Sequence, residues 1–353
     1  MSSPGNLLEQ RVSDVGERAL IERIRMRVPP PPAGLLIGIG DDAAVAAPDR
    51  GALQVLTTDA LVEGIHFDRR FSSPADIGYK ALAVNVSDVA SMGGTPRLAL
   101  LSLMLPQDMA LADLDALLEG LFEMAAECGV ALAGGNITRS PGPLVIDVTA
   151  VGSVKPRKVL TRGGGRAGDA LYVTGQIGAA VAGLGWLRAR SNAMEKDPGW
   201  PPVGRPDDQN LAACVARYCR PAPRARIGAL LGRNRAASAC MDLSDGLADA
   251  VTQMAAASGT GATLDGSALP VHPGAAAWFS TAGADPVAAS LAGGDDYELL
   301  FAVSRRARGR LRAVARESRG IQITCIGELT AEPAIAISRG GRVEPLPAGF
   351  THF

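Results

Sequence analysis

The chain has 353 residues, and the usual domain size of about 100 to 200 residues predicts two domains. Its 35 Lys and Arg residues are balanced by 36 Asp and Glu residues, which excludes a strongly basic surface for nucleic acid and gives no sign of a membrane partner. Residues 1–10 lack the pattern of a signal peptide and no run of about 18 apolar residues occurs, so we expect a cytoplasmic protein that acts on small molecules. The five cysteines form no C-x-x-C pair, so neither a disulfide framework nor a zinc site is indicated.

Helical and strand patterns alternate along the chain. The elements expected in the first half are, in order, a helix at 7–27, strands at 35–39 and 53–56, a helix at 76–92, a strand at 97–105, a helix at 111–128 and strands at 130–133 and 144–154. Those expected in the second half are strands at 170–174 and 238–243, a helix at 246–258 and strands at 297–303 and 321–326.

The domain boundary is expected near a glycine-rich loop at 162–166. We therefore predict an N-terminal domain at 1–156 and a C-terminal α/β domain at 157–353. Residues 190–210 are polar, proline-rich and aperiodic, which predicts a mobile insertion.

Acidic residues cluster at several turns and strand ends. Asp41 and Asp42 follow an apolar strand in a Gly-x-Gly turn; a dinucleotide site is disfavoured there because two carboxylates repel a pyrophosphate unless cations intervene, and an ordinary turn is an equal alternative. Thr57, Thr58 and Asp59 are expected at a strand end, where hydroxyl and carboxylate oxygens suit a hard cation, although a cap or turn is the simpler interpretation.

Asp88 lies in a largely apolar helix, on the same face as Asn85, and needs compensation by Lys80 or by a metal unless it faces solvent. The segment 242–246 runs from a strand into a helix, and its carboxylates either cap that helix or hold Mg²⁺ together with a polyphosphate. A further acidic turn contains Asp295 and Asp296. So many carboxylates without a zinc motif favour Mg²⁺, which usually accompanies phosphates. Neither a P-loop nor the protein-kinase motifs are present.

Seven segments, taken in order, resemble the thiamine-monophosphate kinase family: GIGDD at 38–42, TTDALVEGIHF at 57–67, YKALAVNVSDVASMGG at 79–94, GGNITR at 134–139, LTRGG at 160–164, DLSDGL at 242–247 and GGDDYEL at 293–299. The resemblance implies an α+β subunit with the aminoimidazole ribonucleotide synthetase-like fold. It further implies a homodimer whose N-terminal sheets form a barrel, with ATP and several Mg²⁺ ions between the two domains of a subunit.

The resemblance also assigns roles to individual residues. The implied Mg²⁺ ligands are Asp42, Thr57, Thr58, Asp59, Asp88, Asn136, Asp242 and Asp245. The implied nucleotide contacts are Gly135, Asn136, Arg162 and Ser244, and the implied contacts to thiamine monophosphate are His66, Asp295 and Phe350. The chain departs from the family pattern at Asn136, where the family has Asp, and at Asp295, where it has Glu.

These assignments predict an ATP-dependent thiamine-phosphate kinase. The acceptor phosphate, with a second pKa of about 6, is already largely a dianion near neutral pH, so no strong general base is required. Mg²⁺ ions would offset the repulsion between the two anions during in-line transfer. Two alternatives stay open: a catalytically silent nucleotide- and metal-binding homologue in which Asn136 has weakened the metal cluster, and a related ATP-dependent synthetase.

Overall fold

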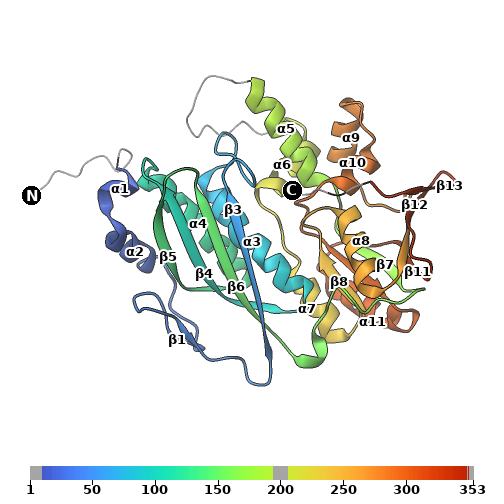
Figure 1. Ribbon diagram of the computed structural model, residues 1–353, viewed down its shortest axis with the longest axis horizontal. Coiled ribbons are helices and arrows are strands. Elements are labelled where there is room, and N and C mark those ends of the chain that lie inside the picture. Colours follow the sequence, from blue (N-terminus) through green and yellow to red (C-terminus); the bar gives the residue numbers. More distant parts are fainter. Residues whose placement is uncertain (1–9, 194–205, 348, 350–353) are drawn as a thin grey trace, which may run out of the picture. The chain divides into compact units, whose positions relative to one another are not determined.

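The computed structural model describes residues 10–193, 206–347 and 349 (Figure 1). The chain divides into two compact units. The N-terminal unit contains the residues up to Val89 together with Pro96–Ser153, and the C-terminal unit contains Ala90–Thr95 and nearly all of the chain from Val154 onward. None of the described helices has both the length and the apolarity needed to cross a bilayer.

The N-terminal unit is built on one four-stranded sheet. Its elements are α1 (Val12–Val15), α2 (Glu17–Arg25), β1 (Leu35–Ile37), β2 (Val45–Ala46), β3 (Leu53–Val62), α3 (Pro74–Ser91), β4 (Thr95–Pro106), α4 (Leu111–Cys128), β5 (Ala131–Ser140) and β6 (Val145–Val154). The strand order of the sheet is β3-β6-β4-β5, and β1 and β2 form a separate antiparallel pair. Strands β3 and β5 are therefore the two edges of the sheet.

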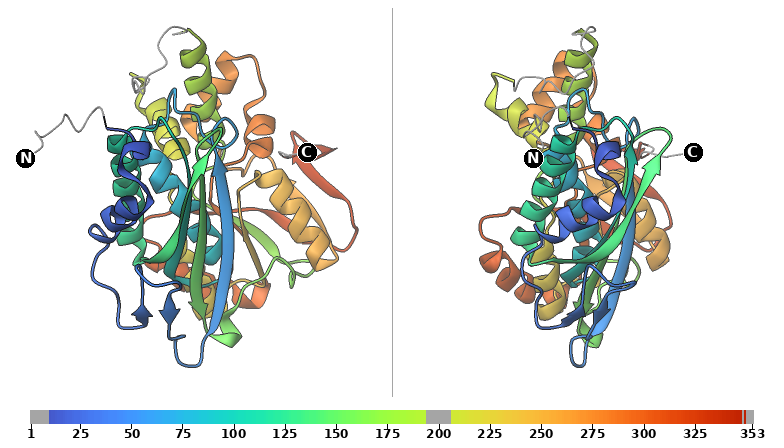
Figure 2. Two further views of the ribbon diagram at one scale, coloured as in Figure 1. Left: turned by 60° about the vertical axis from the view of Figure 1, so that its left-hand side comes forward. Right: turned by 90° about the vertical axis from the view of Figure 1, so that its left-hand side faces the viewer.

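One face of this sheet is covered by α3 and α4 (Figure 2). Every second residue of β6 is buried, as expected for a sheet with one covered face. The two helices cross closely because Gly78 and Gly120 have no side chain at the contact: a Cβ on Gly78 would lie 1.8 Å from the carbonyl oxygen of Leu117. Between positions 77 and 91 of α3, Asp88 is the one half-buried residue, and all the others are buried.

The opposite face carries exposed apolar side chains. Leu56 on β3 is 67% exposed and Leu100 on β4 is 39% exposed. Thr58 and Thr149, whose hydroxyl oxygens lie 3.1 Å apart, belong to the same face.

The C-terminal unit contains a seven-stranded sheet of order β13-β12-β9-β11-β7-β10-β8. Its strands are β7 (Ala170–Thr174), β8 (Ala239–Asp242), β9 (Gly261–Asp265), β10 (Leu299–Val303), β11 (Ile323–Thr330), β12 (Ile335–Arg339) and β13 (Arg342–Pro345). Its α-helices are α5 (Ala179–Ala193), α6 (Gln209–Cys219), α7 (Ala225–Asn234), α8 (Leu247–Ser258), α9 (Pro273–Thr281), α10 (Pro286–Ala292) and α11 (Arg308–Glu317).

Strand β10 lies inside this sheet with both faces covered. Leu300 and Ala302 pack into a core with residues of α8 and α10, whereas Leu299, Phe301 and Val303 pack into a second core with residues of α7 and α11. Helices therefore cover both faces of the sheet, as the expected α/β arrangement requires. The pairing differs from a parallel α/β sheet, because every neighbouring pair except β12–β9 is antiparallel.

Several predicted elements are confirmed and others are wrong. The helix at 111–128 and the strand at 170–174 have the predicted bounds. The single helix predicted at 7–27 is wrong over the described residues, because Gly16 adopts a positive φ of 81° between α1 and α2. Strands β3 and β5 are longer than predicted. Of the segment 190–210, residues up to Ala193 belong to α5 and those from Gln209 belong to α6, and 194–205 lie outside the described residues.

Candidate active site

Thr57 and Asp88 form the centre of the candidate site in the N-terminal unit. The hydroxyl of Thr57 on β3 donates a hydrogen bond of 2.5 Å to Oδ2 of Asp88 on α3. Asp59 lies two residues along β3 and so points to the same face of the strand. These oxygen donors match the preference of Mg²⁺ for carboxylate and hydroxyl ligands. The prediction that Thr57–Asp59 ends a strand is wrong, because β3 continues to Val62.

Thr58 points to the opposite face. Its hydroxyl lies 3.0 Å from Oδ1 of Asp147 and 3.3 Å from the carbonyl oxygen of Val148, both on β6. Successive side chains alternate across a strand, so the side chain of Thr58 does not join those of Thr57 and Asp59. Asp42 is exposed, in the turn between β1 and β2. Among the described residues, no group of three or more His, Cys, Asp or Glu side chains converges as a metal cluster.

The loop after β3 holds His66 by local bonds. The backbone N–H of Val62 donates to Nδ1 of His66 at 3.1 Å, and the His66 N–H donates to the Val62 carbonyl at 2.9 Å. An Nδ1 that accepts this bond leaves the proton of a neutral ring on Nε2. In a neutral ring the Nε2–H of His66 is a hydrogen-bond donor, a group that suits an oxygen acceptor.

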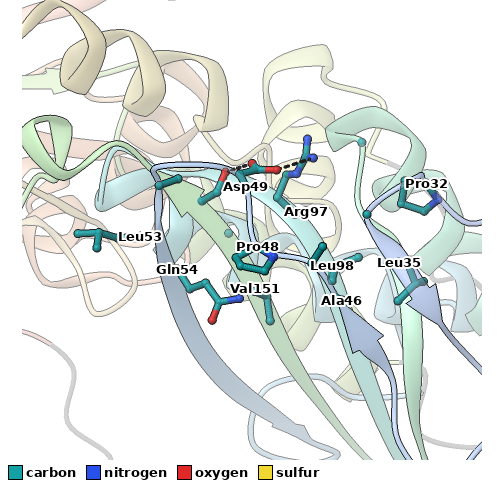
Figure 3. Close-up of a pocket in the computed structure, with 16 residues that line it drawn as sticks. Pro32, Leu35, Ala46, Pro48, Asp49, Leu53, Gln54, Arg97, Leu98 and Val151 are labelled. Atoms are coloured by element: carbon teal, nitrogen blue, oxygen red, sulfur yellow. Dashed lines mark hydrogen bonds and ion pairs between the residues drawn. The ribbon is translucent and has the colours of Figure 1, made fainter.

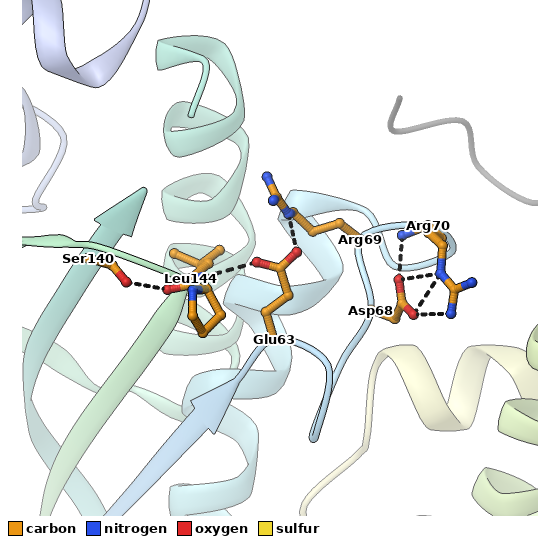
Figure 4. A network of polar contacts seen from close by, with 7 residues as sticks. Glu63, Asp68, Arg69, Arg70, Ser140 and Leu144 are labelled. Carbon is orange, nitrogen blue, oxygen red and sulfur yellow. Dashed lines mark hydrogen bonds and ion pairs between the residues drawn. The ribbon is translucent and has the colours of Figure 1, made fainter. Parts of the chain in front are cut away.

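Glu63 connects this loop to the chain segment between β5 and β6 (Figure 4). One carboxylate oxygen accepts the backbone N–H of Leu144 at 3.0 Å, and the other pairs with Arg69. The Glu63 N–H donates in turn to the Leu144 carbonyl at 3.0 Å. Glu63 therefore links the loop of His66 to a segment about 80 residues further along the chain.

Gly135 and Asn136 lie on edge strand β5, away from β3. Gly135 packs against β4 so closely that a Cβ would lie 1.8 Å from the carbonyl oxygen of Leu101, which explains the need for glycine at this position. Asn136 is exposed and pairs with Ser102 of β4. The strands β3 and β5 are separated by β6 and β4, and three spacings of about 4.8 Å place them roughly 14 Å apart. Within one sheet, Asn136 does not reach the oxygen donors of Thr57 and Asp59 on β3.

A pocket of about 420 Å³ lies beside β5, in the size range of small-molecule sites. Leu20 and Ile137 contribute apolar walls, and Glu17, Thr138 and Arg139 contribute polar groups. The pocket begins one residue beyond Asn136 along the chain.

A second pocket, between the β1–β2 hairpin and the sheet, encloses only about 80 Å³ (Figure 3). Its charged residues are paired: Arg97 lies 3.1 Å from Asp49, and Asp49 accepts a bond of 2.7 Å from Ser153. Small-molecule pockets usually enclose roughly 300 to 1,000 Å³, so we assign no ligand to this one.

In the C-terminal unit, two acidic loops lie side by side. The N–H of Asp295 donates to the Ser244 carbonyl at 2.8 Å, and the N–H of Tyr297 donates to the Leu243 carbonyl at 2.9 Å. Asp242 ends β8 and is buried, and Asp245 precedes α8, where the first turn leaves free N–H groups. The structure thus brings the segment 242–246 together with the turn at 293–298, which sequence reasoning treated separately.

Arg162 lies over the exposed side of α8. Its guanidinium donates to Oε1 of Gln253 at 2.6 Å, and Gln253 in turn donates to Asp249 at 2.5 Å. A Cβ on Gly349 of the C-terminal tail would lie 2.6 Å from the Asp249 side chain, so the tail approaches the start of the same helix. Phe350 lies outside the described residues.

Sequence reasoning missed a buried ionic network behind the turn at 293–298. Glu298 is fully buried, accepts the Thr174 hydroxyl at 2.6 Å and forms a two-bond pair with Arg224. Asp296 is 1% exposed and accepts the N–H groups of Gly178 and Ala180, at 2.6 and 3.1 Å, at the N-terminus of α5. Burial raises the pKa of Asp296 to about 7, although the two N–H donors act in the opposite direction. The only signal in the sequence was that two acidic residues, Asp296 and Glu298, come directly before the apolar residues of β10.

Family comparisons agree with this two-unit arrangement. The model for the AIR synthase related protein, N-terminal domain, matches residues 40–154, and that for the AIR synthase related protein, C-terminal domain, matches residues 166–339. The fold therefore defines a two-domain α+β protein of the AIR synthase-related class.

Comparison with individual relatives identifies the family within this class. The chain is 35% identical to a thiamine-monophosphate kinase of Synechococcus elongatus over 98% of each chain, and 38% identical to that of Escherichia coli strain K12 over 96% of this chain and 98% of that protein. The chain belongs to the thiamine-monophosphate kinase family. A solved structure, AaThiL complexed with AMPPCP and TMP, matches with a TM-score of 0.73 and 30% identity over 98% of this chain and 99% of that one.

Proposed function

We propose that the protein transfers the γ-phosphoryl group of ATP to the phosphate of thiamine monophosphate, forming thiamine diphosphate and ADP. The observation that carries this proposal is the family membership over nearly the whole chain, together with a similar structure that holds an ATP analogue and TMP at the same time. A structure that binds both molecules fits a direct transfer between them better than a covalent intermediate on the protein.

The protein's own task is to hold two anions in line. The acceptor phosphate needs no strong base, because it is already largely dianionic near neutral pH. Bound Mg²⁺ would supply positive charge that offsets the repulsion between the phosphates. The proposed ligands are Asp42, Thr57, Asp59, Asp88 and Asn136 in the N-terminal unit and Asp242 and Asp245 in the C-terminal unit; the side chain of Thr58 is not among them, because it lies on the other face of β3. Their oxygen donors fit this ion, and the 2.5 Å bond from Thr57 to Asp88 holds two of them together.

Nucleotide contacts are proposed at Gly135, Asn136, Arg162 and Ser244. The 420 Å³ pocket beside β5 has the size and the mixed lining for a nucleobase, and it adjoins Asn136. Arg162, held by Gln253, would direct its guanidinium toward phosphate oxygens. For thiamine monophosphate we propose contacts from His66 through its Nε2–H, from Asp295 and from Phe350.

A homodimer explains why the proposed residues occupy both edges of one sheet. If β5 of one subunit pairs with β3 of a second, two four-stranded sheets close into an eight-stranded barrel. Asn136 would then lie on the strand next to the partner's Thr57. The exposed Leu56 and Leu100 would lie in the interior of the barrel, which removes their apolar surface from water.

The proposed reaction is tested by its products. With ATP and Mg²⁺, we expect equal amounts of thiamine diphosphate and ADP from thiamine monophosphate, measured by liquid chromatography. Free thiamine should be inert, because the nucleophile is an existing phosphate and not a hydroxyl. Formation of thiamine diphosphate directly from free thiamine, or ADP release that does not depend on the acceptor, would contradict the proposal.

The variant Asn136→Asp tests the position at which this chain departs from the family. A carboxamide oxygen is an uncharged ligand, so the added carboxylate should lower the Mg²⁺ concentration for half-maximal activity, by roughly three- to tenfold, and leave the rate equal or higher. The measurement is a Mg²⁺ titration at saturating ATP. An unchanged curve would place residue 136 outside the metal shell. A wild type that is silent at every Mg²⁺ concentration but active after the substitution would favour the silent homologue.

A further inference from the structure

The turn that carries Asp295 has an unusual backbone. Asp295 and Tyr297 both have positive φ angles, of 68° and 49°. Residues other than glycine seldom adopt this region, and a bulky aromatic residue does so only where its surroundings enforce it. Backbone outliers of this kind cluster at ligand-binding sites, so the contacts around this turn bear on its function.

The neighbours Asp296 and Glu298, which alternate with Asp295 and Tyr297 along the chain, are buried and hydrogen-bonded. The carboxylate of Asp296 accepts two N–H groups at the start of α5, and the carboxylate of Glu298 pairs with Arg224. Both side chains are almost completely buried, at 1% and 0% exposure. Because these neighbours point inward, the side chain of Asp295 is left half-buried at the surface of the turn.

A third group holds the Asp295 carboxylate itself. The hydroxyl of Tyr297 donates to Oδ1 of Asp295 at 3.1 Å, and the Tyr297 side chain is 8% exposed. The backbone N–H groups of both residues are bonded to the neighbouring 243–244 loop. The backbone and the carboxylate of Asp295 are thus held by contacts within the protein.

We propose that Asp296 and Tyr297 are positioning residues for thiamine monophosphate, with Asp296 fixing the backbone of the turn and Tyr297 fixing the Asp295 carboxylate that contacts the substrate. This inference rests on the proposed function of Asp295. The shorter side chain of Asp, in place of the Glu of the family pattern, has one less rotatable bond, and so depends on the backbone for its placement.

Two substitutions test the proposal, each with a matched control in the same unit. Tyr297→Phe removes only the hydroxyl, and its control is Tyr172→Phe, whose ring stacks on Phe301 at 5.7 Å. Asp296→Asn keeps the volume but turns an NH₂ group toward one of the two N–H donors, and its control is Asp265→Asn at the exposed end of β9. Steady-state kinetics are measured at a temperature where circular dichroism shows every variant to be folded.

We expect KM for thiamine monophosphate to rise about fivefold in Tyr297→Phe and about tenfold or more in Asp296→Asn, while KM for ATP stays within about twofold of the wild type. Both controls should match the wild type.

A residue with a merely structural role would lower the melting temperature without this selective change in KM. Should Asp296→Asn fail to fold, Tyr297→Phe alone decides the proposal. If the wild type is active and Tyr297→Phe has the same KM for thiamine monophosphate, the inference is overturned but the proposed function stands. If the wild type is inert toward thiamine monophosphate, the proposed function is overturned as well.

Discussion

Replacing Asp88 by Asn should reduce kcat by roughly a hundredfold or more while the protein stays folded. Metal ligation contributes several kcal/mol of transition-state stabilisation in phosphoryl transfer, and about 1.4 kcal/mol corresponds to a tenfold change in rate. The amide oxygen of Asn can still accept the hydrogen bond from Thr57, so the contact between β3 and α3 is preserved. The measurement combines kcat at saturating ATP and thiamine monophosphate with a thermal unfolding curve.

The control for this substitution is Asp113→Asn, in the first turn of α4 in the same unit. It removes a carboxylate that interacts with a helix N-terminus, which is worth only about 0.3 to 1 kcal/mol of stability, and should leave kcat unchanged. A near-normal rate of Asp88→Asn at limiting Mg²⁺ would show that Asp88 only supports Thr57 and binds no metal.

Arg224→Ala should destabilise the C-terminal unit by about 3 to 5 kcal/mol, because it leaves the fully buried carboxylate of Glu298 without its two-bond partner. Arg217, at 3.7 Å from Glu298, does not replace that geometry. Because two units need not unfold together, the measurement is native-state hydrogen exchange of the amides of β10.

Arg233→Ala is the matched control for this stability change. Its partner Glu317 is 2.8 Å away, but both side chains are largely exposed, so the loss should be at most about 1 kcal/mol. Equal losses in the two variants would mean that the Arg224–Glu298 pair contributes no more than a surface pair.

The sequence predicted elements best where one pattern ran without interruption. Helix α4 carries regular apolar spacing from Leu111 to Cys128, and its bounds were predicted correctly. Strand β3 was predicted too short because its polar residues, including Thr57 and Asp59, interrupt the apolar pattern. Strand β5 was cut short at Gly134 and Gly135, because glycine usually marks a turn, whereas here it permits contact between adjacent strands.

The candidate site was predictable as a set of residue types and not as an arrangement. Acidic residues beside small polar ones indicated oxygen-ligated metal chemistry, and the structure pairs Thr57 with Asp88. The side chain of Thr58 points away from them because of its position along β3. The strand predicted at 53–56 did not include that position, so the direction of Thr58 was not predicted. The network around Glu298 joins it to residues 74 and 124 positions away, Arg224 and Thr174, and no local pattern encodes such contacts.

The central claim is that the phosphoryl group passes from ATP to the phosphate of thiamine monophosphate, and radioactive ATP labelled at the γ position tests it most directly. In a single turnover with Mg²⁺ and unlabelled thiamine monophosphate, the label should appear only in the terminal phosphate of thiamine diphosphate, and acid hydrolysis of that phosphate should leave unlabelled thiamine monophosphate. Label that is released only as inorganic phosphate, or that is found in the inner phosphate of the product, would contradict the claim.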